Sequence, residues 1–325
     1  MFSRKISIAQ LAAGGVLCVT SAVAHAQTYP NRPVRYVVAS SIGSGVDIVG
    51  RVMAEELGLL FGQQFVVDNR AGAGTNLGID IVAKAAPDGY TLLLATPALA
   101  ANVSLYRNLP FDPVRDFAPV TQVASGLNAV CVTPALPAKS LKELIALARA
   151  KPGALNFASG GTGTSSYLAA ELFKSAAGVN LTHVPYKGGG PAITGLMAGE
   201  TEVMFSPFAN CLPFAKQGRV RMIALTSPRR APSMPDVPTP GDAGLPAYDF
   251  ESWYPMMAPA RTPRAIIEQL HRGVVEVLRK PAVVARLHDL GFVPVGSRPE
   301  ELAAYVKSEI AKLGKVIRDA GISAN

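Results

Sequence analysis

Glycines and hydroxyl side chains follow an apolar segment near the middle of the chain, in a pattern suited to binding an anion. Phe157 and Ala158 lead into Ser159–Ser166, which is rich in Gly, Ser and Thr, and the apolar positions after it recur with helical spacing. The pattern predicts a strand, a glycine turn and a helix. Because a helix N-terminus has unpaired N–H groups and partial positive charge, this turn suits a carboxylate or a phosphate. A helix start that binds nothing explains the same residues equally well.

The motifs of common enzyme classes are missing. The sequence has no G-x-S-x-G, no H-E-x-x-H and no P-loop, and Leu77 stands where a dinucleotide fingerprint starting at Gly72 needs its third glycine. Asp47 is a candidate general base, but a carboxylate that stabilises a helix N-terminus explains it as well. His183 follows a strand near the glycine turn and is either a ligand contact or a packed residue. We predict no catalytic residues, no cofactor and no metal.

Strands and helices alternate along the chain, and several strands end in glycine or hydroxyl turns. The strands before residue 100 are predicted at Val34–Ala39, Gln64–Asp68 and Tyr90–Ala95, and a second series includes Asn128–Val132 and Glu202–Phe205. This alternation predicts an α/β protein with mainly parallel sheets. In such sheets ligands bind beyond the carboxyl ends of the strands, where the turns lie.

Two proline-rich connections bracket the middle of the chain, one at 111–119 and one at 226–244. They predict two domains joined by two crossings of the chain. Domain I comprises residues 27–120 and a C-terminal return at 227–325, and domain II comprises residues 121–226. We expect a ligand cleft between the domains that closes by a hinge motion.

The first 26 residues have the features of a secretory signal peptide. Arg4 and Lys5 precede the mostly apolar segment Ile6–Val23, and Ala24-His25-Ala26 fits the cleavage pattern, so we expect cleavage after Ala26. The alternative is a membrane anchor, but Ser, Gln and Gly dilute the apolar segment, which has roughly the minimum length for a bilayer. We find no later apolar run long enough to span a membrane.

Charge and cysteine content limit the partners. The formal charge is +8, and it falls to +6 when the signal peptide takes Arg4 and Lys5 away. Because the basic residues are scattered, a nucleic-acid surface is a poor explanation of the positive charge, and a modest field that favours anionic solutes is a better one.

A disulfide between Cys131 and Cys211 is allowed in an oxidising compartment, but the sequence does not place the two close together.

Six short motifs, in order along the mature chain, resemble those of the extracytoplasmic solute receptors of tripartite tricarboxylate transporters, also called Bug-type receptors. The motifs are Tyr29–Arg35, Asp68–Gly74, Pro87–Leu92, Ala158–Gly163, His183–Gly188 and Pro235–Thr239. Each motif alone is weak, but the ordered set is specific and covers essentially the whole mature chain.

The resemblance implies a two-domain periplasmic binding protein of type II-like fold that closes on a small solute, usually a carboxylate. It implies a monomer that delivers this organic anion to a large and a small membrane subunit driven by an ion gradient. By position in the motifs and turns, it implies the following ligand-binding residues: Ser41, Gly43, Ser44, Asp47, Thr96, Ser159, Gly161, Thr162, Gly163, Thr164, Ser165, Tyr186 and Phe205.

The sequence also departs from the family pattern. Ser40 lies in a first turn that lacks the usual Pro-aromatic-Pro-Pro-Gly-Gly run, Tyr167 replaces a common His, and Ser206 replaces a common Asp. Because the lost carboxylate would weaken binding of a ligand amine, an amino acid ligand is not assumed. The sequence does not name the ligand. It leaves open a receptor that feeds a signalling system, and an enzyme that acts on a small acid through Asp47.

Overall fold

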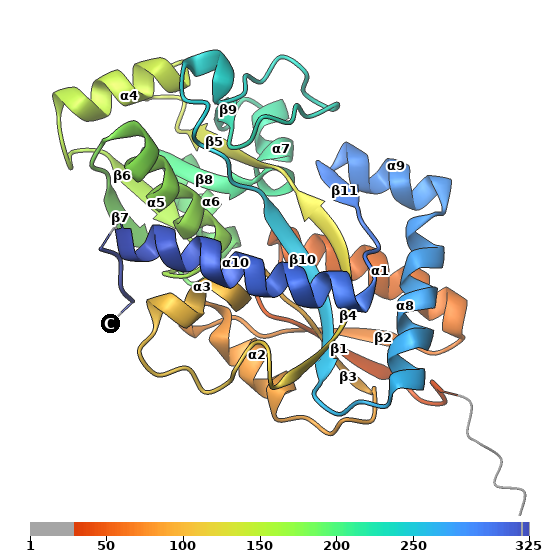
Figure 1. Cartoon of the computed structure of the whole chain (residues 1–325). Helices are drawn as coiled ribbons and strands as arrows, with labels where there is room; N and C mark the ends of the chain where they lie inside the picture. Colours follow the sequence, from red (N-terminus) through yellow and green to blue (C-terminus); the bar gives the residue numbers. More distant parts are fainter. Residues whose placement is uncertain (1–28, 320, 325) are drawn as a thin grey trace, which may run out of the picture.

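The computed structural model describes residues 29–319 and 321–324, so the predicted signal peptide lies outside the described residues. Two β-sheets lie one above the other, and helices cover both faces of each (Figure 1). The lower sheet has the order β11-β4-β10-β3-β1-β2, and the upper sheet has the order β7-β6-β8-β5-β9. We call them the first and the second sheet.

The strands of the first sheet come from both ends of the described chain. They are β1 (Val34–Val38), β2 (Phe65–Asn69), β3 (Thr91–Leu94), β4 (Phe117–Gly126), β10 (Ser252–Pro259) and β11 (Phe292–Pro294). The second sheet is continuous in sequence. Its strands are β5 (Asn128–Val132), β6 (Asn156–Ser159), β7 (Thr182–Pro185), β8 (Val203–Pro207) and β9 (Arg221–Leu225).

The helices alternate with these strands. Those associated with the first sheet are α1 (Gly45–Phe61), the short helix η1 (Ala73–Thr75), α2 (Asn76–Ala83), α3 (Ala98–Leu105), α8 (Arg264–Leu278), α9 (Pro281–Asp289) and α10 (Pro299–Asp319). The second series comprises α4 (Leu141–Ala150), α5 (Ser165–Ala177), α6 (Gly189–Ala198), α7 (Phe208–Lys216) and the short helix η2 (Gly241–Ala243). None of the helices in the described residues is long and apolar enough to cross a membrane.

The α/β fold with two sheets is as predicted, but each sheet is mixed and not mainly parallel. Strands β2, β1 and β3 are parallel, and so are β7, β6 and β8, whereas β4, β10 and β5 pair with their neighbours in antiparallel directions. The reason is the path between the sheets. The chain leaves the first sheet along β4 and returns along β10, and an antiparallel pair needs no crossover helix.

The predicted connection at 111–119 already contains the start of β4, which extends to Gly126 before the chain enters the second sheet at Asn128. The predicted boundary between residues 120 and 121 therefore falls inside a strand of the first sheet. The domain limits 27–120, 121–226 and 227–325 stay predictions.

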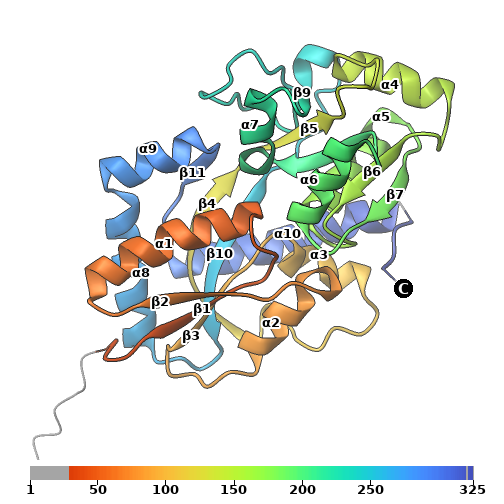
Figure 2. The same ribbon diagram turned by 180° about the vertical axis from the view of Figure 1, so that it is seen from behind.

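The apolar core joins the two halves. One buried cluster packs α1 and α8 on the first sheet, around Leu57 and Leu270, and another packs α6 and α7 on the second sheet, around Leu196 and Phe208. A third cluster is continuous from Leu99 to Phe157 and links both sheets. Helix α10 packs on α3 and extends towards the edge of the second sheet in both views (Figures 1 and 2).

The two cysteines lie in the second half of the fold. The structure joins Cys131 on β5 and Cys211 on α7 in a disulfide, and both residues are fully buried. This pairing, which the sequence left open, connects strand β5, next to the edge strand β9, with helix α7.

Candidate functional site

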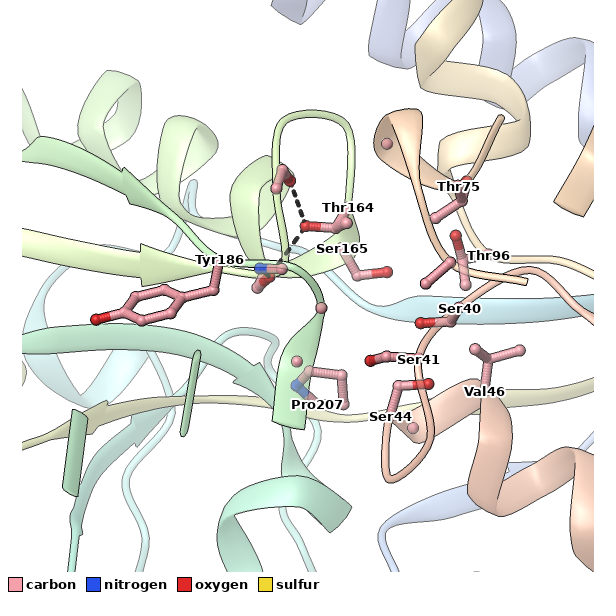
Figure 3. A pocket seen from close by; sticks show the side chains of 18 of the residues that line it. Ser40, Ser41, Ser44, Val46, Thr75, Thr96, Thr164, Ser165, Tyr186 and Pro207 are labelled. Carbon is pink, nitrogen blue, oxygen red and sulfur yellow. Dashed lines mark hydrogen bonds between the residues drawn. The ribbon is translucent and has the colours of Figure 1, made fainter. Parts of the chain in front are cut away.

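A cavity of about 430 Å³ lies between the two sheets, where the turns at the carboxyl ends of their parallel strands face each other (Figure 3). Its walls are formed by Ser40, Ser41, Ser44, Gly45, Val46, Ala71, Gly72, Ala73, Gly74, Thr75, Thr96, Gly160, Gly161, Thr164, Ser165, Ser166, Tyr186, Lys187, Gly188, Gly189, Met204, Pro207, Asn210 and Tyr254. The first wall comes from turns of the first sheet, and the second wall comes from turns of the second sheet.

The turn between β1 and α1 is held in shape by Asp47. Its buried carboxylate accepts hydrogen bonds from the backbone N–H of Gly43 (2.8 Å), from Asn69 Nδ2 (2.9 Å) and from Arg51 Nε (3.0 Å). Ser44 caps the helix by accepting from the backbone N–H of Asp47 (3.4 Å). All these contacts lie within the first half of the fold, so Asp47 organises the first wall and is absent from the residues that line the cavity.

The rest of the first wall follows β2 and β3. Thr75 has a positive φ of 79° and caps α2 without a side-chain hydrogen bond, and its buried Oγ1 atom has no partner among the described residues. Thr96 Oγ1 accepts from the backbone N–H of Ala98 at the start of α3 (3.4 Å). In Figure 3 both threonines face the second wall.

The second wall centres on the glycine turn before α5. Thr164 Oγ1 donates to the carbonyl oxygen of Gly161 (2.6 Å) and lies 3.1 Å from Ser166 Oγ, which accepts from the backbone N–H of Gly160 (3.0 Å). Because the Thr164 hydroxyl is bonded to its own turn, it does not cap α5. The first backbone N–H groups of α5 are therefore left for a ligand.

Ser159 and His183 stabilise this turn from outside the cavity lining. Ser159 Oγ accepts from the backbone N–H of Gly161 (3.0 Å) and lies 2.7 Å from His183 Nε2. The His183 ring stacks on Phe157 and contacts Tyr167, and burial, assisted by the charge of Lys174, lowers its pKa to about 4. The ring is thus neutral near pH 7, and Ser159 is fully buried.

Two further turns complete the second wall. Tyr186 lines the cavity, but its ring points away in Figure 3 and its hydroxyl donates to Glu200 (2.8 Å). Gly188 and Gly189 begin α6, and Pro207 and Asn210 begin α7. Tyr254, from the antiparallel strand β10, and Met204, from strand β8, line the cavity from within strands.

The cavity is almost uncharged. Among its lining residues only Lys187 carries a charge, and its side chain is exposed. The starts of α1, α3, α5, α6 and α7 all border the cavity. The arrangement offers backbone N–H groups, hydroxyls and helix dipoles to a ligand, which is the chemistry of an anion site built from neutral donors. Within the described part of the chain, no cluster of three or more His, Cys, Asp or Glu residues could hold a metal.

The predicted site residues divide into two groups. Those that line the cavity are Ser41, Ser44, Thr96, Gly161, Thr164, Ser165 and Tyr186. Those outside its lining are Gly43, Asp47, Ser159, Thr162, Gly163 and Phe205; Phe205 is fully buried between Phe157 and Phe173. Which of them contact a ligand stays a prediction.

Sequence reasoning missed part of the walls. The turn at 71–75 follows the predicted strand Gln64–Asp68, and its position at a strand end is the feature that could have placed it on the cavity wall. Asn210 and Tyr254 had no such signal, because the packing of α7 and β10 brings them to the cavity. Of the three departures from the family pattern, Ser40 lines the cavity, whereas Tyr167 and Ser206 are buried outside its lining.

Comparisons with known proteins agree with this geometry. Residues 49–322 match the model of the family described as tripartite tricarboxylate transporter family receptor. The protein BugT of Bordetella pertussis is 35% identical over 316 residues, which cover 96% of this chain and 97% of BugT. The structure of Rhodopseudomonas palustris Rpa4515 with adipate is similar at 35% identity and a TM-score of 0.88, covering 91% of this chain and 99% of that one. The structure of MatC from Rhodopseudomonas palustris with bound malate has 33% identity and a TM-score of 0.84, covering 89% and 100%.

Proposed function

Since this chain belongs to the tripartite tricarboxylate transporter receptor family, we propose that it captures a small carboxylate between its two sheets and delivers it to a membrane transporter. The family, the Bug-type relationship and the periplasmic binding protein fold predicted from the ordered motifs are confirmed. Two relatives of similar fold were solved with adipate and with malate, which are both dicarboxylates.

The observation that supports a carboxylate is the uncapped start of α5 opposite the first wall. The Thr164 hydroxyl bonds to Gly161, so the first amides of α5 are free, and Ser165 directs its hydroxyl towards the space between the walls (Figure 3). Opposite it stand Ser44 and the start of α1. An anion between the walls accepts hydrogen bonds from donors on both walls. A receptor that closes on its solute requires such contacts from both sides.

We also propose that the protein has no catalytic activity. The residues that line the cavity include no Asp, Glu, His or Cys, so its walls carry no carboxylate or imidazole that could act as a general base and no thiolate. Asp47 is bonded to its own turn, and the Ser159–His183 pair lies behind the second wall. Both candidates for enzyme chemistry, Asp47 and the Ser159–His183 pair, therefore stabilise the shape of the walls.

The location and the partners complete the proposal. The family is periplasmic, and we propose that the signal peptide is cleaved after Ala26. The mature chain then acts as a monomer, whose partners are its organic anion and the large and small membrane subunits of the transporter.

The test is native mass spectrometry of the mature protein, followed by thermal shift with adipate, malate and succinate. An acid at 100 times its dissociation constant adds about 2.7 kcal/mol of stability, which corresponds to a rise in Tm of roughly 5–10 °C. Adipamide is the control, because it has the length of adipate without its charge. Equal shifts with adipamide and adipate, or no shift with any acid, would contradict a carboxylate receptor.

A further inference from the structure

The inner end of the cavity contains two buried polar groups without partners. Asn210 on α7 and Tyr254 on β10 both line the cavity, and their side chains are more than nine-tenths buried. Asn210 Oδ1 and the Tyr254 hydroxyl accept or donate no hydrogen bond among the described residues. Buried polar atoms without partners are costly, and where such atoms line a cavity a ligand can satisfy them.

The two groups come from different sheets, and each lies near the start of α1. An added side-chain carbon at Gly45 would lie 2.8 Å from the Tyr254 hydroxyl and 2.9 Å from Pro207 Cβ, and one at Gly189 would lie 3.1 Å from Asn210 Nδ2. Tyr254 therefore adjoins Gly45, and Asn210 adjoins Gly189, where the added carbon would also lie 4.0 Å from Ser44 Cβ.

One side chain competes for the Tyr254 hydroxyl. Burial raises the pKa of Tyr254 above its usual range, and Ser252 on the same strand acts in the opposite direction. Ser252 Oγ, however, donates to Asn128 Oδ1 (2.8 Å) and makes no hydrogen bond of standard geometry with Tyr254. The phenol therefore stays protonated and keeps its own proton and lone pairs for the cavity.

The unpartnered oxygen of Asn210 favours a ligand group that can donate a hydrogen bond. Met204 contributes a thioether, and Pro207 has no N–H, so neither stabilises an ion. A carboxylate has no proton to donate to Asn210 Oδ1, and its own lone pairs would face that oxygen. A ligand hydroxyl carries both a proton to donate to Asn210 Oδ1 and lone pairs to accept from Tyr254.

We propose that Asn210 and Tyr254 form an uncharged subsite that selects acids carrying a hydroxyl group, with the carboxylate held at the helix starts. This inference rests on the proposed carboxylate receptor and specifies its substrate class.

The experiment compares acids in pairs that differ only by a hydroxyl: malate with succinate, and 2-hydroxyadipate with adipate. Dissociation constants are measured by calorimetry for the wild type, Tyr254→Phe and Asn210→Leu. One hydrogen bond gained at the subsite favours the hydroxy acid of at least one pair by roughly tenfold in the wild type. In each variant this preference falls to about one, while affinity for the unsubstituted acid changes less than about twofold.

Tyr36→Phe is the matched control. The Tyr36 hydroxyl is also buried and without a partner, but Tyr36 lies in the core of the first sheet and does not line the cavity. Its removal leaves the hydroxyl preference unchanged. In Tyr254→Phe the ring still packs against Phe292, so the fold is retained even where Asn210→Leu fails to fold.

Three results would overturn the proposal. Equal affinity of the wild type for both members of each pair would refute the hydroxyl subsite while leaving the carboxylate receptor intact. A preference that survives in Tyr254→Phe, or that disappears equally in Tyr36→Phe, would remove these residues from the selection. If none of the four acids binds, the proposed function fails and this inference fails with it.

Discussion

Ser159→Ala and Ser165→Ala should separate the residues that build the glycine turn from those that contact the ligand. Both serines belong to one short segment, and sequence alone assigns both to the ligand. The structure places Ser159 Oγ behind the turn, bonded to Gly161 and His183, whereas the Ser165 hydroxyl points into the cavity and makes no hydrogen bond among the described residues (Figure 3).

The two variants should therefore lose different quantities. Ser159→Ala leaves the backbone N–H of Gly161 and the neutral ring of His183 without their partner in a fully buried position, which lowers the free energy of unfolding by about 1–3 kcal/mol. Ser165→Ala changes the free energy of unfolding by less than about 0.5 kcal/mol. It removes one donor to a charged ligand, which costs about 1.5–3 kcal/mol of binding, or roughly 10–150-fold in affinity.

Urea denaturation of the ligand-free proteins measures the first quantity, and calorimetric titration with the acid of largest thermal shift measures the second. If the variants and the wild type have equal m-values, a difference in midpoint reflects a difference in stability and not a changed unfolded state. The reasoning is refuted if Ser159→Ala keeps its stability and loses affinity, or if Ser165→Ala unfolds more easily and binds as before.

Two further predictions follow from the second wall. Because burial and then Lys174 lower the pKa of His183 to about 4, below its usual 6.5, the neutral ring contributes stability that is complete above pH 6.5 and is lost as the pH falls towards 4. His183→Gln should flatten the dependence of unfolding free energy on pH in that window, measured in urea at pH 7, 5.5 and 4.5; an unchanged slope would contradict the assignment. Gly188→Ala should weaken ligand affinity and prevent ligand-induced compaction in small-angle scattering, because the new Cβ would overlap Ser41 Oγ on the opposite wall. The control is Gly199→Ala, because Gly199 also has a positive φ but has open space around it. If both substitutions weaken affinity equally, the loss of affinity comes from backbone strain and not from overlap with Ser41.

Much of the site could be predicted because strand–turn–helix units are local. The turns after β1, β3 and β6 were recognisable from glycines and hydroxyls at the ends of apolar segments, and all three contribute to the walls. The direction of each side chain within a turn was not recognisable. Ser159 and Thr162 have the same residue types as their neighbours on the wall, and tertiary packing decides which of them face the cavity.

The mixed sheets and the inner end of the cavity could not be predicted, because both depend on pairing between distant segments. Strand β10 pairs with β3 and β4, which places Tyr254 next to the start of α1, about two hundred residues earlier in the chain. Periodicity identifies β10 as apolar, but nothing in it indicates the neighbouring strand or the antiparallel direction. The same holds for Asn210, whose position depends on how α7 packs on the second sheet.

The near absence of charge on the walls explains why the two halves must approach so closely. A fixed arginine could attract an acid from a distance, but backbone amides and hydroxyls act only within hydrogen-bond range. The walls therefore meet at glycines: an added Cβ at Gly74 would overlap the carbonyl oxygen of Thr162, and one at Gly163 would overlap Asn102 Oδ1. Any side chain at these positions would hold the walls apart and withdraw the donors of one wall from the ligand. In this receptor, affinity for an anion thus depends on the closed arrangement itself, and the glycines that permit contact between the walls are as important for binding as the residues that contact the solute.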